Sequence, residues 1–143
     1  MFIDDSIKQK VTQFLNLARP NMGDALGIQF ESFKPDEIKG SMPVDDNTVQ
    51  PFGILHGGAS VTLAETLASV GGWLKLDDDS KTAVGVEINA NHIRSARRGE
   101  TVFGTAVPVH VGRSIQVWEI EITNESDKLV CTSRCTLAVV EKK

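Results

Sequence analysis

One apolar stretch, at residues 59–74, is followed along the chain only by segments that have the pattern of β-strands. Small and apolar residues occupy nearly every position of this stretch, which predicts a buried helix. Strand-like segments follow at 82–94, 100–111, 114–123 and 129–140. Parallel strands need crossover helices between them, and no helical pattern separates these segments. The sequence therefore predicts an α+β fold in which an antiparallel sheet wraps around one long central helix.

The N-terminal part has the pattern of a short helix followed by a β-hairpin. Asp4, Asp5 and Ser6 are suitable capping and first-turn residues. Apolar residues recur at helical spacing at Ile3, Ile7, Val11, Phe14, Leu15 and Ala18. Strand-like alternation then comes in two pieces, 25–33 and 37–44, on either side of Lys34-Pro35-Asp36. We therefore expect a short N-terminal helix that packs on the domain, and a hairpin after it.

The formal net charge of -4 over 143 residues limits the kinds of partner. Nucleic-acid binding depends on clustered Lys and Arg that neutralise phosphates, and an acidic chain offers no such footprint. The chain has no apolar run long enough to span a membrane, and its N-terminus, MFIDDSIKQK, places two acids where a signal peptide places positive charge. We expect one soluble, cytoplasmic domain spanning residues 1–143.

Cys131 and Cys135 are the only cysteines. They stand four residues apart in a strand-like segment, which separates them by ~13 Å at the rise of a β-strand. This exceeds the ~7 Å limit on the Cα separation of a disulfide. No His or Cys stands at ligand spacing nearby, which argues against a zinc site. We expect two reduced structural thiols and no bound metal.

Glu65 is the only ionisable residue within the apolar stretch. An unpaired carboxylate is costly to bury, so this position needs a physical reason. A structural reason would be an ion pair at an interface or a hydrogen bond to a backbone group. A catalytic reason would be a general base or a nucleophile.

Two glycines, Gly57 and Gly58, stand at the start of this stretch, directly after His56. Their backbone N–H groups can approach a ligand closely, and the unpaired N–H groups at a helix start favour negative charge. They suit the oxyanion that develops on a thioester carbonyl, although a tight turn onto the helix would also explain them. Ser69, one turn beyond Glu65, is placed to bond the carboxylate or a water molecule.

Helix geometry separates the two halves of this candidate site. Gly57 and Glu65 are eight residues apart, which is ~12 Å along a helix axis, too far for both to contact one carbonyl carbon. Two such helices packed antiparallel about a two-fold axis would bring the start of one level with the middle of the other. We therefore predict an obligate dimer in which His56 and Gly57 of one subunit face Glu65 and Ser69 of its partner.

Three stretches, QPFGILHGGASVTLAE, GVEINANHIRSAR and HVGRSIQVWEI, resemble the hotdog-fold thioesterases of the phenylacetic-acid-pathway type. Within that family the likeness is strongest to the branch of menaquinone and enterobactin synthesis, and it covers roughly residues 40–140. The resemblance implies an acyl-CoA thioesterase without a cofactor, whose active site is shared across a dimer, usually within a dimer of dimers. It also implies a role for each matching residue: Glu65 as base or nucleophile, the Gly57 N–H as oxyanion donor, His56 and Gln50 as orienting groups, and Ser69 as the holder of the attacking water.

The same resemblance implies that coenzyme A lies near His92, Arg94 and Ser95, with Arg113 and Ser114 contributed by a facing strand turn. Arg94, Arg97 and Arg98 form the only dense basic cluster of the chain, and guanidinium groups suit phosphates. Solvated loop charges would explain Arg97 and Arg98 equally well, and a structural role would explain His92.

Two other functions also fit a helix beside a thioester. A hotdog dehydratase or hydratase would need a second acid or base, and His56 is the only candidate. A non-catalytic acyl-CoA sensor has less support, because the chain is acidic, shows no DNA-binding helices and retains Glu65. For a thioesterase, the resemblance favours an aromatic acyl group, such as 1,4-dihydroxy-2-naphthoyl, or a broad range of acyl groups. Trp73, at the far end of the helix, would narrow an acyl pocket or fill the core.

Overall fold

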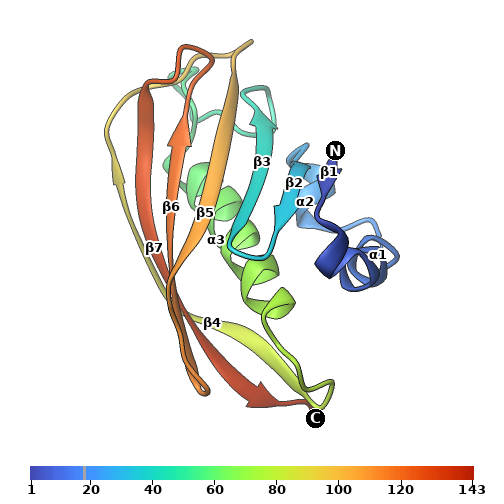
Figure 1. Cartoon of the computed structure of the whole chain (residues 1–143). Coiled ribbons are helices and arrows are strands. Elements are labelled where there is room, and N and C mark those ends of the chain that lie inside the picture. Colours follow the sequence, from blue (N-terminus) through green and yellow to red (C-terminus); the bar gives the residue numbers. More distant parts are fainter. Residues whose placement is uncertain (18) are drawn as a thin grey trace.

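The computed structural model describes residues 1–17 and 19–143, so Ala18, the last residue of the predicted N-terminal helix, lies outside the described residues. In outline, the short N-terminal helix, the hairpin, the long helix and the four strands after it follow one another as the sequence predicts, and the strands form one seven-stranded sheet (Figure 1). The strands are β1 (Phe2–Ile3), β2 (Gln29–Lys34), β3 (Glu37–Pro43), β4 (Lys81–His92), β5 (Thr101–Val111), β6 (Ile115–Thr123) and β7 (Leu129–Glu141). The helices are the 3-10 turn η1 (Asp5–Ile7), α1 (Lys8–Leu15), α2 (Met22–Ala25) and α3 (Gly57–Leu74).

The sheet has the strand order β1-β2-β3-β5-β6-β7-β4. Every pair of neighbouring strands is antiparallel except β1 and β2, which are parallel. The sheet curves around α3, which runs along its concave side (Figure 1). The predicted antiparallel sheet around one long helix is therefore confirmed, and β4 lies at an edge of it.

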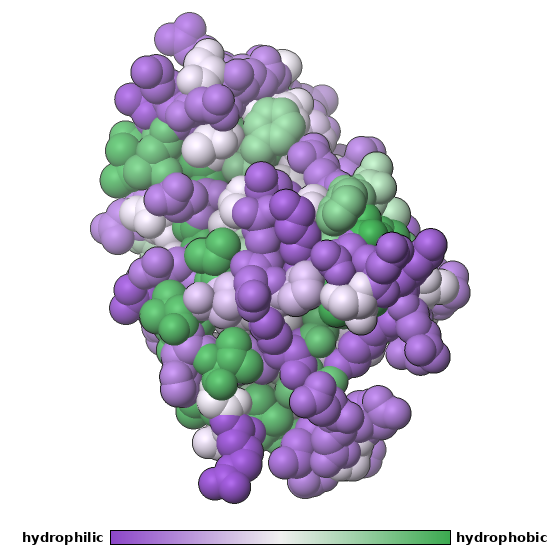
Figure 2. Space-filling model, viewed as in Figure 1, coloured by the Kyte–Doolittle hydropathy of each residue, from purple (hydrophilic) through white to green (hydrophobic). Residues whose placement is uncertain are grey.

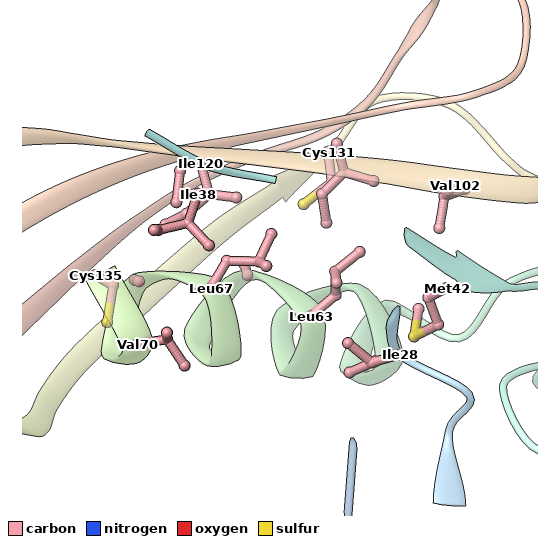
Figure 3. Packing of buried hydrophobic residues seen from close by; sticks show 14 of the residues in the cluster. Ile28, Ile38, Met42, Leu63, Leu67, Val70, Val102, Ile120, Cys131 and Cys135 are labelled. Carbon is pink, nitrogen blue, oxygen red and sulfur yellow. The ribbon is translucent and has the colours of Figure 1, made fainter. Parts of the chain in front are cut away.

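Helix α3 begins at Gly57, two residues before the predicted stretch, because the His56 side chain caps its first turn. Leu63 and Leu67 are fully buried and point from α3 toward the sheet (Figure 3). Ile120 and Cys131 meet them from the sheet strands (Figure 3). This packing makes α3 the centre of the hydrophobic core and fixes where its remaining side chains can point.

The first residues differ from the predicted helix. Phe2 and Ile3 form a strand that pairs in parallel with β2, and Asp4 caps η1 by accepting a hydrogen bond from the Ser6 N–H at 2.9 Å. The regular helix α1 therefore begins only at Lys8. The helical periodicity correctly indicated which side of this segment is buried. Its first residues instead form hydrogen bonds with the edge of β2, a tertiary interaction that outweighs the local helical pattern.

The predicted first strand of the hairpin also begins later than its pattern indicates. An Asn21 capping box, in which the Asn21 side chain accepts from the Asp24 N–H, starts the short helix α2. This helix takes up Ala25, so β2 begins at Gln29. The hairpin of β2 and β3 itself is confirmed.

The surface carries apolar patches over the lower part of the strands β5 to β7 (Figure 2). Large apolar side chains are also exposed on β4, where Val84 and Val86 are 43% and 61% accessible. A long edge strand with exposed apolar residues is a ready surface for pairing with another chain. Across the described residues, no helix combines the length and hydropathy needed to cross a membrane.

Candidate active site

The site is built around the first turn of α3. His56 is the N-cap residue, and its Nδ1 accepts a hydrogen bond from the Gly58 N–H at 2.8 Å. Its imidazole is exposed, so Nε2 remains available to a substrate. Within the described residues, the N–H of Gly57 donates to no acceptor. This amide can therefore serve a negatively charged ligand at the positive end of the helix dipole.

His92, at the end of β4, stands directly against this first turn. A Cβ on Gly57 would lie 2.7 Å from the His92 Nε2 atom, closer than side chains tolerate. Residue 57 must therefore lack a side chain for the imidazole to occupy this place. The sequence predicted His92 as a coenzyme A contact, and the fold brings it next to the free helix amide as well.

A pocket of about 330 Å³ opens at this point between α3, β4 and the loop that precedes α3. Five of the ten predicted site residues line it: Gln50, Gly57, His92, Arg94 and Ser95. Ile54, Leu55, Ile93 and Val130 supply apolar walls, and Ser60 completes the lining. Ser60 was missed by the sequence reasoning, although it stands one helical turn after Gly57 on the same face.

Glu65 lies two turns further along α3 and outside this pocket. Its Oε1 would be 2.7 Å from a Cβ on Gly85, so the carboxylate rests against the backbone of β4. The side chain is half-buried, and no hydrogen bond or ion pair holds it within the described part of the chain. Of the two structural explanations for this carboxylate, the hydrogen bond to a backbone group therefore finds no support within one chain.

Cys135 is the buried neighbour of this carboxylate on β7. Burial, together with the nearby Glu65 and Glu87 carboxylates, raises the pKa of the Cys135 thiol to about 11. Both cysteines are free and buried, as the sequence predicted. A thiol that stays protonated at neutral pH is no nucleophile, so Cys135 serves as packing beside Glu65.

Ser69 follows Glu65 by one helical turn and is also half-buried. In the described residues no hydrogen bond joins the Ser69 hydroxyl to Glu65, so the serine remains available to a water molecule or a substrate. Together these two side chains face away from the fully buried positions of α3.

The comparisons with known proteins identify the family of this chain. Residues 52–131 match the Thioesterase superfamily. The chain belongs to this family. It is 50% identical over 135 residues to the 1,4-dihydroxy-2-naphthoyl-CoA hydrolase of Escherichia coli, covering 93% of this chain and 98% of that protein. It is 47% identical to the proofreading thioesterase EntH of Cronobacter turicensis, covering 80% of this chain and 82% of that protein.

The solved structures lead to the same family. The thioesterase HI1161 of Haemophilus influenzae superposes with a TM-score of 0.82 at 47% identity, covering 93% of this chain and 90% of that chain. The predicted hotdog fold and the predicted thioester hydrolase activity are thereby confirmed. The chain is an acyl-CoA thioesterase at this level of detail.

The three arginines of the basic cluster differ in the contacts that their guanidinium groups make. Arg94 lies at the pocket and donates from its guanidinium to the Leu129 carbonyl at 2.8 Å. Arg98 forms an exposed ion pair with Asp46. No ion pair engages the Arg97 guanidinium in the described residues. The predicted basic cluster therefore presents Arg94 and Arg97 as the cations available to a phosphate.

Arg113 and Ser114 occupy the turn between β5 and β6, at the other end of the thioesterase sheet. Ile115 is paired with Ala138 of β7, whereas His92 is paired with Cys131 of the same strand. These two positions on β7 are seven residues apart, which is ~23 Å along a strand. Within one chain, Arg113 and Ser114 thus lie far from the pocket that contains His92, Arg94 and Ser95.

Proposed function

We propose that this thioesterase hydrolyses acyl-CoA thioesters that carry an aromatic acyl group, of the 1,4-dihydroxy-2-naphthoyl kind, with Glu65 as its catalytic carboxylate. The half-buried, unpartnered carboxylate of Glu65 is the observation that carries the proposal. Relatives named 1,4-dihydroxy-2-naphthoyl-CoA hydrolase, from Escherichia coli at 50% identity and from Listeria monocytogenes at 45%, support the acyl group. A broad acyl range is the less specific form of the same function.

In this mechanism the thioester oxygen faces the free N–H of Gly57, which stabilises the negative charge that develops there. Gln50 and His56 orient the thioester. Glu65 either removes a proton from a water molecule held by Ser69 or attacks the carbonyl to form a mixed anhydride. In both routes the carbon–sulfur bond breaks and coenzyme A leaves as the thiol; in the second route water then hydrolyses the anhydride, which releases the free acid and regenerates the Glu65 carboxylate.

The site needs two subunits, because the two halves are ~12 Å apart on one helix. Strand β4 supports the same conclusion independently. Gly85 of this strand lies against the Glu65 carboxylate, and His92 of the same strand lies against Gly57. Antiparallel pairing of two β4 edges, with Gly85 opposite the partner's His92, would bring each Glu65 to the Gly57 of the other subunit. The exposed Val84 and Val86 lie on this edge strand.

The same pairing would complete a coenzyme A site. Val84 is paired with Ala138, and Ala138 is paired with Ile115, so the turn with Arg113 and Ser114 lies near the Gly85 end of β4. In the dimer, that end faces the partner's His92, Arg94 and Ser95. Guanidinium groups from both subunits would then reach the phosphates of one coenzyme A. We also propose that two such dimers associate as a tetramer.

The test is replacement of the carboxylate by its isosteric amide. We expect Glu65→Gln to lower kcat by about a hundredfold or more, since a positioned base contributes roughly 10²–10⁴. Thiol release from benzoyl-CoA and 1,4-dihydroxy-2-naphthoyl-CoA measures this, and Glu121→Gln, on the exposed side of β6, is the matched control. Near-normal turnover by Glu65→Gln would contradict the assignment.

A further inference from the structure

The turn that precedes α3 holds Phe52 outside the folded chain. Phe52 is 89% exposed, the most exposed large apolar side chain in the described residues. The turn is not loosely held: the Gln50 N–H donates to the Ile54 carbonyl, and the Gly53 N–H donates to the Gln50 carbonyl, both at 2.9 Å. Gly53 has a φ of 83°, a conformation that favours glycine. A fixed turn that presents a phenyl ring to water indicates a surface that receives the ring.

The position of this turn determines which surface it can meet. The segment between β3 and α3 lies beyond the N-terminal end of α3 (Figure 1). In the antiparallel dimer proposed above, Gly57 is level with the partner's Glu65. Residues that precede Gly57 then come level with residues that follow Glu65 in the partner, which are Ser69 and Trp73 one and two turns later.

The partner surface at that level is aromatic and held in place. Trp73 is half-buried, and its ring lies 5.2 Å from the Lys10 ammonium and 6.3 Å from the Phe14 ring. Lys10 also donates to the Trp73 carbonyl at 3.0 Å, which ties the end of α3 to α1. Trp73 therefore offers a wall of fixed orientation at the far end of the half-buried face that carries Glu65 and Ser69.

We infer that Phe52 of each subunit crosses the dimer boundary and closes the acyl site of its partner opposite Trp73, as a specificity-determining residue. This inference rests on the proposed function and names what the acyl site recognises. Two aromatic walls with the thioester between them favour a planar acyl group, because aromatic rings gain additional energy from stacked or edge-to-face contact. A linear acyl chain gains less from the same walls.

The first test is the selectivity of Phe52→Ala. We expect the ratio of kcat/KM for benzoyl-CoA to that for acetyl-CoA to fall about tenfold, mainly through a higher KM for benzoyl-CoA, which is the size of one lost aromatic contact. Phe52→Tyr should keep the wild-type ratio. Phe2→Ala, which removes another exposed phenyl ring far from the site, is the control and should leave the ratio unchanged.

The second test asks which subunit supplies the ring. A dimer of one Glu65→Ala chain and one Phe52→Ala chain, isolated with two affinity tags, retains one working site. If Phe52 acts across the boundary, that site contains wild-type Glu65 and wild-type Phe52, so the dimer keeps the wild-type benzoyl-to-acetyl ratio. A ratio equal to that of the Phe52→Ala homodimer would overturn the inference.

The two tests separate this inference from the function on which it rests. Equal losses on benzoyl-CoA and acetyl-CoA in Phe52→Ala would overturn the specificity role while leaving the thioesterase intact. Full activity of the Glu65→Ala homodimer would instead contradict the catalytic assignment, and the mixed dimer would then have two working sites rather than one.

Discussion

At the scale of single residues, the contact between Gly57 and His92 is the most restrictive feature of the site. The imidazole occupies the space that any side chain at position 57 would need. Because the His92 side chain is exposed, a methyl group at position 57 would move the ring rather than the helix. A methyl group at position 57 should therefore affect substrate binding more than the free energy of unfolding.

We therefore expect Gly57→Ala to behave like His92→Ala. Both should raise KM for an acyl-CoA substrate by a similar factor, because both remove the imidazole from the pocket. The free energy of unfolding of Gly57→Ala should fall by only about 1 kcal/mol. The double variant should be no worse than either single variant, since the two changes act through one contact. Steady-state kinetics on all three variants measures this, and simple additivity would contradict it.

Cys135 gives a prediction about pH. Its pKa is 9.0 without perturbation and about 11 in the folded chain, so the folded state keeps a proton that the unfolded state loses between these values. The free energy of unfolding should therefore be unaffected by this thiol below pH 9 and should fall as the pH rises from about 9 to 11. Urea unfolding of wild type and Cys135→Ala over this range measures the difference. The same slope in both proteins would show that other groups cause the change.

At the scale of elements, α1 anchors the end of α3. No glycine in the left-handed conformation ends α3, and Lys75 is its C-cap residue. Lys10 instead donates to the Trp73 carbonyl in the last turn of α3 and to the Leu76 carbonyl just beyond it, and the Trp73 carbonyl also accepts from the Leu76 N–H. Burial lowers the pKa of Lys10, and the nearby Asp77 and Asp79 oppose this shift. A short N-terminal helix thereby stabilises the element that carries Glu65.

Replacing Lys10 should show this contribution. We expect Lys10→Met to lower the free energy of unfolding by about 1–2 kcal/mol, because it retains most of the apolar stem but removes the ammonium that donates to the Trp73 and Leu76 carbonyls. Lys8→Met, an exposed position on the same helix, should change stability by less than about 0.5 kcal/mol. Urea unfolding at neutral pH compares the two. Equal losses would indicate that the charge of α1, rather than the contact with α3, matters.

At the scale of the whole molecule, one chain holds the parts of two half-sites. The free amide of Gly57 lies with His92 at one end of β4, and Glu65 lies with Gly85 toward the other end. The exposed edge of β4 runs from the Gly57–His92 contact to the Glu65–Gly85 contact. The proposed dimer would thus create its active sites and cover its edge strand by the same pairing.

A charge placed on this edge should separate the subunits. We expect Val86→Asp to shift the protein from its assembly of β4-paired dimers to monomer in sedimentation equilibrium, and thiol release to fall in parallel with the fraction of paired subunits. Val109→Asp, a similarly exposed valine on β5 away from the β4 edge, should keep the subunits paired through β4. An active Val86→Asp monomer would contradict the shared site.

Local patterns in the sequence were sufficient for most elements. The apolar run predicted α3, and strand alternation predicted β2 to β7 within a few residues, because helical and strand periodicities are properties of neighbouring residues. Glu65 was identified for the same reason, as one charge in an apolar helix. The exceptions, Ile3 and Ala25, belong to segments where a strand edge or a capping box overrode the pattern.

Only the tertiary structure decided how the site is arranged. Gly57 and His92 are 35 residues apart in the chain, and their contact depends on where β4 ends beside α3. The separation of Arg113 from Arg94 depends on the register of β6, β7 and β4. Such contacts depend on strand pairing and helix packing between residues far apart in the sequence. The periodicity of neighbouring residues carries no information about them. The sequence by itself determined which groups are candidates for the chemistry, because their types and spacing are local, and the register of the sheet determined which of them can meet within one chain.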